Sequence, residues 1–268
     1  MALAANTEKD PLYEKFKKQI FDLTKIDLSS YKEAQMKRRI NDMIRKNNFS
    51  GYEAFVQGIK SDKQLFNDFV EHLTINVSEF YRNVDQWKLM DEQIIPTLIE
   101  RFGKRLKIWS AACSTGDEPY TIVMLLSKHI PMADIKVLAY DLDAEALRKA
   151  KAGMYDAKSV AGVPAEFKNK FFKKEGDKYL ISDEIKKHVE FKQANLLRDP
   201  YPKDCHLIVC RNVLIYFTEE AKDKIFRDYY DSLKPLGYLF IGSTEQIVQY
   251  RDIGFTRKGS FFYEKPEK

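Results

Sequence analysis

A turn of small and polar residues follows an apolar stretch of the chain, and it is the first place where chemistry is expected. Residues 108–120 read IWSAACSTGDEPY, which predicts a buried strand over residues 106–112, a turn and the start of a helix. Small residues let a ligand approach the backbone closely, and the free N–H groups at a helix start favour polar or anionic groups. The pattern therefore predicts a ligand-binding turn.

Carboxylates at the end of a second predicted strand give this turn a chemical context. Residues 135–142 predict that strand, with Asp141 and Asp143 at its end. In a doubly wound fold, a carboxylate at the tip of the second strand holds the two hydroxyls of a ribose. The layout indicates a nucleoside-cofactor site and favours S-adenosylmethionine. The single glycine, Gly116, is also compatible with a strand–helix turn that binds nothing.

Two charged residues near this turn each have a functional and a structural interpretation. Glu118 stands at the helix start, where it either stabilises the helix dipole or meets the cationic end of the cofactor. Arg82 lies in residues 76–83, which read NVSEFYRN. Its guanidinium offers a rigid fork for a carboxylate, although the segment also reads as a capping loop with a solvated charge.

Polar residues also end two further predicted strands. Arg211 and Asn212 follow an apolar run, and polar side chains at strand ends of an open α/β sheet point into the ligand site. Tyr216 either lies over the reacting centre or is a packed aromatic with a bonded hydroxyl. Asn195 can bind the adenine edge and Leu196 can pack on the ring, but a turn residue with an apolar neighbour explains both equally well.

Composition bounds the remaining possibilities. The 268 residues allow one large domain or two modest ones, and 44% hydrophobic with 32% charged residues is ordinary for a globular protein. No apolar run approaches the roughly 18 residues that span a bilayer, and residues 1–10 lack the apolar core of a secretory signal. The three cysteines and four histidines form neither a disulfide framework nor a metal motif, which favours a cytoplasmic location and no metal. The net charge of +5 is too small to establish nucleic-acid binding.

The chain changes its periodicity after its first third. Apolar residues recur only at helical spacing before residue 106, which predicts helices over residues 11–24, 31–46, 52–60 and 62–73. Ser29 and Ser30 are expected to cap the second of these helices. We interpret residues 1–83 as a helical domain and residues 84–268 as a second domain, entered through a helix over residues 85–102 that contains Pro96.

Strands and helices alternate in the second domain. After the first two strands, further strands are predicted over residues 189–194, 207–213, 238–243, 255–258 and 261–265, with helices over residues 119–129, 144–152 and 219–233. This alternation predicts a doubly wound, mostly parallel α/β sheet covered on both faces, and the last two strands predict an antiparallel hairpin. A polar insert at about residues 171–188 predicts a small β-subdomain, with Gly176 in its turn.

The helix over residues 31–46 is unusually basic. Its cations include Lys37, Arg38, Arg39 and Arg45, and apolar residues at helical spacing supply its buried side. A run of charge is usually a solvated face, but this density of cations also fits a surface for an acidic partner.

Taken together, these segments resemble the chemotaxis receptor methyltransferases, the CheR family, over nearly the whole chain. The resemblance rests on the helical first domain and on five blocks in order, which are residues 74–82, 109–120, 141–143, 195–197 and 210–217. Asp117 stands where many relatives carry glutamate. The insert, shorter than in members that dock a receptor peptide and without a glycine-rich turn beyond Gly176, argues against tight peptide tethering.

The resemblance implies transfer of a methyl group from S-adenosylmethionine to glutamate side chains on the cytoplasmic helical bundle of chemoreceptors, with S-adenosylhomocysteine as product. It implies that the basic helix meets the receptor and that Arg82 and Tyr216 are nearest the chemistry. It also implies a cytoplasmic protein recruited to membrane receptor arrays, and we expect a monomer without membrane insertion, metal or nucleic acid. The implied cofactor-binding residues are Asn76, Ser78, Arg82, Glu118, Asp141, Asn195, Leu196, Arg211 and Asn212.

Glutamate is ionised at neutral pH because its ordinary pKa is about 4.3, so the expected reaction is a direct displacement without a general base. Two rival functions use the same cofactor domain. An RNA methyltransferase would hold phosphate on the basic helix, and its activity would fall steeply with salt. An adaptor on receptor arrays would bind the cofactor and transfer nothing.

Overall fold

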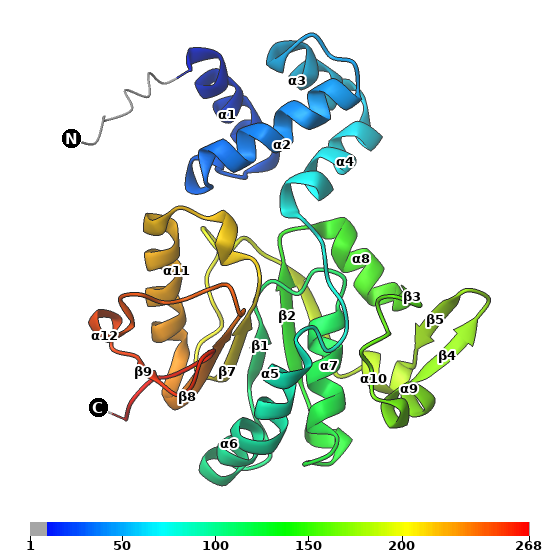
Figure 1. The fold of residues 1–268 in the computed structure, drawn as a ribbon, viewed down its shortest axis with the longest axis vertical. Helices are drawn as coiled ribbons and strands as arrows, with labels where there is room; N and C mark the ends of the chain where they lie inside the picture. The colour runs from blue at the N-terminus through cyan, green and yellow to red at the C-terminus, as the bar shows by residue number, and fades with distance from the viewer. Residues whose placement is uncertain (1–9, 268) are drawn as a thin grey trace. The chain divides into compact units, whose positions relative to one another are not determined.

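The computed structural model describes residues 10–267, and the expectations about residues 1–9 lie outside this range. Within it, the chain forms two compact units, one of residues up to Ile75 with Tyr216–Glu220, the other of Asn76–Ile215 with the residues from Ala221 onward (Figure 1). The division falls at Ile75 rather than at residue 83. The reason is local, because the loop that follows Ile75 is bonded into the second unit, where Phe80 N donates to Ser159 O at 3.0 Å.

The first unit is helical, as predicted. The two helices that follow Asp10 and Asp62 begin at side-chain caps, because Asp10 accepts from the N–H groups of Leu12 and Tyr13, and Asp62 accepts from those of Gln64 and Leu65. Phe16, Phe55 and Phe69 are fully buried between the helices. The elements are α1 (Pro11–Thr24), η1 (Leu28–Ser30), α2 (Glu33–Lys46), α3 (Tyr52–Ser61) and α4 (Lys63–Thr74).

The predicted capping of α2 by Ser29 and Ser30 is wrong. Both serines belong to the short turn η1, and the helix begins at Glu33 without a side-chain cap. The preceding residues are extended because Tyr31 forms an antiparallel bridge with Phe217, with Lys32 N donating to Tyr216 O and Thr218 N donating to Ser30 O, each at 2.9 Å. A backbone already paired in this way cannot continue the helix towards its N-terminus.

The second unit is built on the predicted α/β sheet, whose strands in the described range are ordered β6-β2-β1-β7-β8-β10-β9 (Figure 1). The first four pairings in that order are parallel, and β10 is antiparallel to both β8 and β9. The predicted mostly parallel sheet with an antiparallel C-terminal hairpin is therefore confirmed. The strands are β1 (Ile108–Ser110), β2 (Val137–Asp141), β6 (Val189–Gln193), β7 (Cys205–Cys210), β8 (Leu233–Ile241), β9 (Thr256–Arg257) and β10 (Phe262–Glu264).

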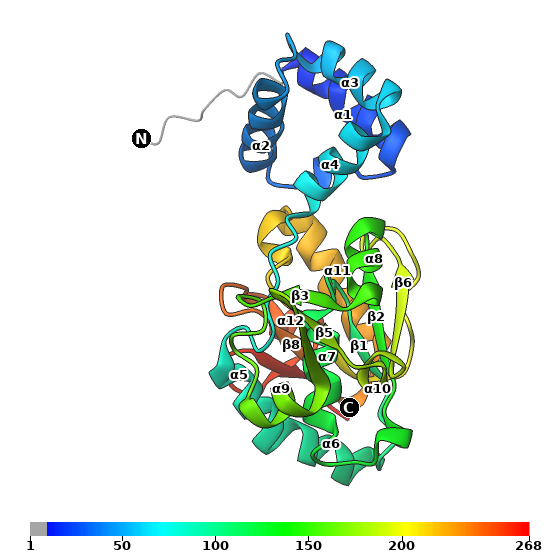
Figure 2. The same ribbon diagram turned by 90° about the vertical axis from the view of Figure 1, so that its right-hand side faces the viewer.

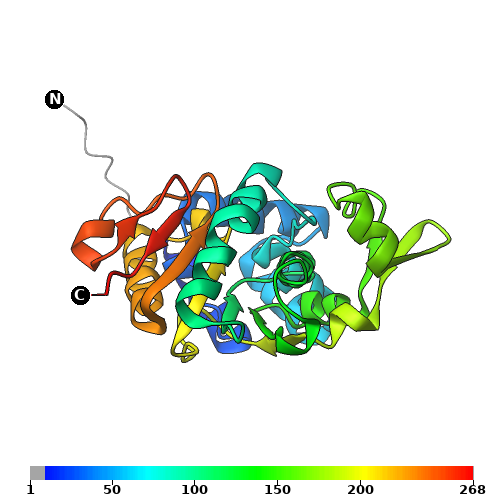
Figure 3. The ribbon, with the colours of Figure 1, turned by 90° about the horizontal axis from the view of Figure 1, so that it is seen from below.

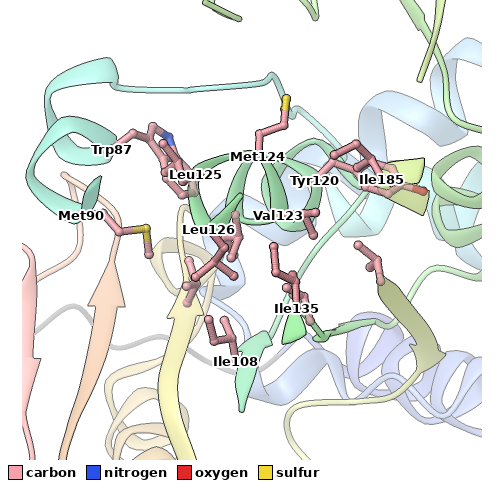
Figure 4. Close-up of a cluster of buried hydrophobic side chains, with 14 of the residues drawn as sticks. Trp87, Met90, Ile108, Tyr120, Val123, Met124, Leu125, Leu126, Ile135 and Ile185 are labelled. Atoms are coloured by element: carbon pink, nitrogen blue, oxygen red, sulfur yellow. The ribbon is translucent and has the colours of Figure 1, made fainter. Parts of the chain in front are cut away.

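Successive side chains of a strand point to opposite faces of the sheet, and both faces are covered. On one face, Val123 and Leu126 of α7 (Asp117–Leu126) pack towards Ile108, and Trp87 lies beside them (Figure 4). On the other, the Trp109 ring contacts Tyr229 of α11 (Glu219–Ser232) at 5.6 Å between centroids. The remaining elements are η3 (Met132–Asp134), α8 (Ala144–Ala152), α9 (Ala165–Phe171), α10 (Asp183–Lys186), η4 (Leu214–Tyr216) and α12 (Tyr250–Ile253).

The helix predicted over residues 85–102 is interrupted. It consists of α5 (Val84–Leu89), a π-helical turn η2 (Met90–Ile94) and α6 (Ile95–Phe102). Pro96 lies in the first turn of α6, and proline has no N–H to donate to the preceding turn. The π-helical turn, which is wider than an α-helical turn and lies just before Pro96, accommodates the absence of that hydrogen bond.

The predicted β-subdomain is present but begins earlier in the chain. The hairpin of β4 (Phe172–Glu175) and β5 (Lys178–Ile181) turns at Gly176, and β3 (Met154–Asp156) pairs with the other edge of β5. Within the second unit, this small sheet projects to one side of the main sheet (Figure 3) and lies in front of it when the molecule is viewed from that side (Figure 2). A strand of three residues is too short to produce a recognisable alternation in the sequence.

No helix within residues 10–267 has the length and apolar composition of a membrane span.

Candidate cofactor and active site

The turn after β1 is held in a conformation that needs its small residues. Gly116 has a φ of +89°, and a Cβ there would lie 2.9 Å from Ala150 Cβ and 3.2 Å from the Tyr155 hydroxyl. Tyr155 Oη donates to Thr115 O at 2.7 Å, which fixes the turn from the side of the β-subdomain. The turn therefore brings the backbone at residues 113–116 close to the ends of β1 and β2.

Asp141, at the end of β2, connects the turn that follows β1 with the turn that follows β2. Its carboxylate accepts from Ser114 N at 2.7 Å and from Asp143 N at 2.9 Å. Burial raises the pKa of Asp141 to about 6, even though backbone N–H donors stabilise its charged form. A carboxylate in this place is the acceptor that a ribose diol requires.

Asn76 ties the first residue of the second unit to the same place. Its amide nitrogen donates to Asp143 Oδ2 at 2.6 Å, and its amide oxygen accepts from Ser114 Oγ at 3.0 Å. Asp143 also caps α8 by accepting from the N–H groups of Glu145 and Ala146. The predicted site residues Asn76 and Asp141 are thus brought together through Ser114 and Asp143.

Glu118 and Arg211 form a buried charged pair. Glu118 Oε1 accepts from Ser110 Oγ at 2.8 Å, and Glu118 Oε2 lies 3.6 Å from the Arg211 guanidinium. Burial raises the pKa of Glu118, and the positive charge of Arg211 limits that increase. Burial lowers the pKa of Arg211, and the Glu118 carboxylate opposes that decrease. Each charge therefore stabilises the other, because burial disfavours the charged form of both groups.

Arg211 also links the end of β7 to the loop that carries Arg82. Its Nη2 donates to Arg82 O at 2.6 Å and to Gln86 Oε1 at 3.1 Å, while the guanidinium stacks 4.9 Å from the Trp87 ring. The Arg82 side chain is half-buried and donates to Val77 O at 3.1 Å. The positive charge of Arg82 further lowers the pKa of Arg211.

The other predicted cofactor contacts lie at two further strand ends of the same unit. After β6, Asn195 Oδ1 accepts from Leu197 N at 2.9 Å, and the backbone oxygen of Leu196 accepts from Tyr201 Oη at 2.6 Å. The Asn195 side-chain oxygen thus forms a turn, which was the alternative left open from sequence. After β7, Asn212 has a φ of +59°.

The predicted substrate contacts belong to the first unit. Tyr216 is half-buried there. Lys37 Nζ is paired with Asp10 Oδ2 at 2.6 Å, and Arg39 donates to the backbone oxygen of His72. Lys37 and Arg39 therefore support the packing of this unit, whereas two other predicted cations stay exposed, namely Arg38 and Arg45, the latter paired with Asp42.

Sequence reasoning missed Asp117, which organises the loop around Ser78. The fully buried carboxylate accepts from Thr115 Oγ1 at 2.6 Å and from Ser159 Oγ at 2.5 Å. Burial raises its pKa, and hydrogen bonds from Ser159, Thr115 and the predicted site residue Ser78 limit the increase. The signal in the sequence that could have identified it was an acidic residue, directly before Glu118, to which no role was assigned. Glu245 is a second buried acid that sequence reasoning missed.

These groups fit a ligand that combines ribose hydroxyls, a cation and a carboxylate. Asp141 presents a carboxylate that can accept from such hydroxyls, and Glu118 is a buried carboxylate that can face a cation. The buried Arg211 Nε donates to no acceptor among residues 10–267, so an acceptor on a ligand would satisfy it. Over the same residues, no group of three or more His, Cys, Asp or Glu side chains is placed to hold a metal ion.

Comparison with known proteins places the whole arrangement in a family. Residues 76–259 match the description "CheR methyltransferase, SAM binding domain", and residues 11–74 match "CheR methyltransferase, all-alpha domain". A chemotaxis protein methyltransferase of Listeria innocua is 39% identical over 258 residues, covering 96% of this chain and 98% of the relative. Chemotaxis protein methyltransferase 2 of Vibrio cholerae is 33% identical over 230 residues, covering 82% and 80%.

The matched segments coincide with the two kinds of structure described above. The all-α match spans the helices α1 to α4, and the SAM-binding match begins at Asn76, where the second unit begins. The fold, the cofactor domain and the predicted resemblance therefore agree. The chain belongs to the CheR methyltransferase family and is an S-adenosylmethionine-dependent methyltransferase.

Proposed function

We propose that this protein transfers the methyl group of S-adenosylmethionine to glutamate side chains of chemoreceptors. The products are glutamate methyl esters and S-adenosylhomocysteine. The observation that carries the proposal is the assembly of three charged side chains: Asp141 at the end of β2, Arg211 directly after β7, and Glu118 at the start of α7, the helix that follows the intervening strand β1. It occurs in a chain whose relatives are chemotaxis protein methyltransferases.

The residues of the second unit would hold the cofactor by its polar groups. Bound S-adenosylmethionine supplies an electrophilic methyl group on a sulfonium. Asp141 accepts hydrogen bonds from the ribose hydroxyls, and Glu118 faces the cationic end. Asn76, Ser78, Arg211 and Asn212 line the same site, and Asn195 and Leu196 contact the adenine.

The proposed nucleophile explains why this chain needs no catalytic base. A glutamate carboxylate is ionised at neutral pH because its ordinary pKa is about 4.3. Catalysis then depends on holding the carboxylate in line with the methyl group, and such positioning supplies roughly 7–11 kcal/mol in well-oriented reactions. The carboxylate oxygen forms a bond to the methyl carbon as the bond from that carbon to the sulfonium sulfur breaks, which leaves a neutral ester and a neutral thioether. A site that excludes water therefore favours the transfer once both charges are held.

Arg82 and Tyr216 are the residues that we assign to the substrate. The Arg82 guanidinium orients the carboxylate through a charged hydrogen bond, and the Tyr216 hydroxyl donates to the oxygen that does not attack. The exposed Arg38 and Arg45 of α2 contact the acidic receptor helices, and Lys37 and Arg39 add positive charge to the same helix. We further propose a monomer in the cytoplasm that is recruited to receptor arrays.

Cofactor affinity should depend on pH through Asp141. The ribose hydroxyls bind the ionised carboxylate, and Asp141 has a pKa of about 6. Lowering the pH from 7.5 to 5 is therefore expected to weaken S-adenosylhomocysteine binding about tenfold through this group. Titration calorimetry at several pH values measures the change.

Asp141→Asn is the control, because an amide does not titrate. The variant should bind weakly with a flatter pH dependence, and a dependence as steep as that of the wild type would exclude Asp141 as its source.

The contribution of Asp141 to folding stability depends on pH in the opposite direction. Because the pKa of Asp141 is raised in the folded protein, its contribution to stability is present below its ordinary pKa of 3.8 and is lost as the pH rises through 6.

The proposal is tested against its two rivals in one experiment. Purified protein and methyl-labelled S-adenosylmethionine are incubated with a receptor cytoplasmic fragment or with total RNA, at low and at high salt. We expect label in the receptor fragment alone. Label in RNA that disappears at high salt would support the RNA methyltransferase, and cofactor binding without transfer would support the adaptor.

A further inference from the structure

Glu245 is a buried acid that the proposed chemistry does not use. It follows β8 in the sequence Gly242-Ser243-Thr244-Glu245 and is only 4% exposed. A carboxylate withdrawn from water is costly unless hydrogen bonds satisfy it. The contacts that satisfy Glu245 therefore indicate what it does.

Those contacts go to the backbone of the loop after β7. Glu245 Oε2 accepts from Asn212 N at 2.8 Å and from Gly242 N at 2.8 Å, and Glu245 Oε1 accepts from Leu214 N at 2.7 Å. Burial raises the pKa of Glu245, and backbone donors that also include Val213 limit the increase. Four donors match the acceptor capacity of one carboxylate.

The loop that Glu245 holds takes a left-handed turn and is closely packed. Asn212 has a φ of +59°, in the left-handed region that asparagine adopts more readily than most residues with a side chain. A Cβ at Gly242 would lie 2.6 Å from Glu245 Oε2 and 2.8 Å from Asn212 N. Glycine at position 242 therefore leaves the space in which the carboxylate meets the loop.

The held residues directly follow Arg211. Arg211 pairs with Glu118 and donates to Arg82 O, so a shift of the loop would move both the Glu118–Arg211 pair and the backbone of Arg82. The charge of Glu245 also acts on Arg211 and on Glu118. Glu245 is thus connected to the cofactor site by the backbone and by charge.

We propose that Glu245 is a positioning residue for the cofactor site, which holds Asn212 and Arg211 in the geometry that binds S-adenosylmethionine. The inference rests on the proposed placement of the cofactor among these residues. Glu245 itself touches backbone N–H groups and acts only through the loop.

The test is the affinity of Glu245→Gln for S-adenosylhomocysteine, measured by titration calorimetry. Glutamine has the size of glutamate but presents an NH2 group to at least one of the N–H donors. We expect the Kd to rise at least tenfold, while the number of ligand molecules bound per folded protein molecule stays near one. Glu184→Gln, which changes an exposed acid in α10, is the matched control and should leave the Kd unchanged.

A second variant separates positioning from folding. Gly242→Ala keeps the carboxylate but displaces it from Asn212 N, and it should also raise the Kd. An unchanged Kd with a lower Tm or a reduced bound fraction would mean that Glu245 merely supports the fold, and it would overturn the inference. A wild type that fails to bind S-adenosylhomocysteine would instead overturn the proposed function, and the inference with it. If Glu245→Gln does not fold, the Kd of Gly242→Ala tests the inference: a raised Kd supports it and an unchanged Kd overturns it.

Discussion

Replacing Arg211 by methionine is expected to lower the free energy of unfolding by about 3–5 kcal/mol, because it leaves a buried charge without its partner. The Glu118 carboxylate would lose the guanidinium 3.6 Å away. Arg82 O and Gln86 Oε1 would lose their donor as well. For a chain of this size, the loss corresponds to a decrease in Tm of roughly 10 °C. Urea unfolding followed by circular dichroism measures the free energy.

Two further variants isolate the charged pair. Arg105→Met removes an arginine whose side chain is 91% exposed and should change stability by less than about 0.5 kcal/mol. The double variant Arg211→Met/Glu118→Gln should recover part of the loss because no unpaired charge remains. Since Arg211 holds down the raised pKa of Glu118, the single variant should be more destabilised at pH 8 than at pH 5. Equal destabilisation in the single and double variants would contradict this account.

Replacing Arg82 by alanine is expected to lower the kcat/KM of receptor methylation about 100- to 1,000-fold, the usual cost of removing one oriented charged donor. Tyr216→Phe is expected to lower kcat about tenfold, since it removes one hydrogen bond to a charged oxygen. Initial rates with a receptor fragment give both values. Binding of S-adenosylhomocysteine to each variant is measured in parallel.

Arg82→Lys is the matched variant for the guanidinium. A lysine keeps the charge but cannot form the two parallel hydrogen bonds of an arginine fork, so it should recover only part of the activity. The loss of turnover should exceed the loss of cofactor affinity if Arg82 acts on the substrate. Wild-type turnover in both Arg82→Ala and Tyr216→Phe would show that the roles assigned to these residues are wrong.

Elements defined by local signals were predictable from the sequence. The bounds of α8 were predicted, because Asp143 caps its start and Gly153, with a φ of +71°, ends it. The order of strands and helices in the second unit followed from their different periodicities. The carboxylate at the end of β2 was also predictable, since strand ends of an open α/β sheet have a known geometry.

Features that depend on distant residues could not be predicted in the same way. The start of α2 is set by the bridge between Tyr31 and Phe217, which lie far apart in the sequence. Lys37 and Arg39 looked like part of a solvated charged face until their contacts with Asp10 and His72 were known. Glu245 and Asp117 read as ordinary acids because a sequence does not reveal which carboxylates are buried.

The central claim is that the methyl group is transferred to a side-chain carboxylate of a receptor, and the stability of the product bond tests it most directly. Receptor fragment labelled from methyl-labelled S-adenosylmethionine is isolated and treated with mild base, and volatile label is collected. The account predicts release of the label as methanol, because mild base hydrolyses a glutamate methyl ester. Label that stays on the receptor after this treatment would show methylation of another group and would contradict the account.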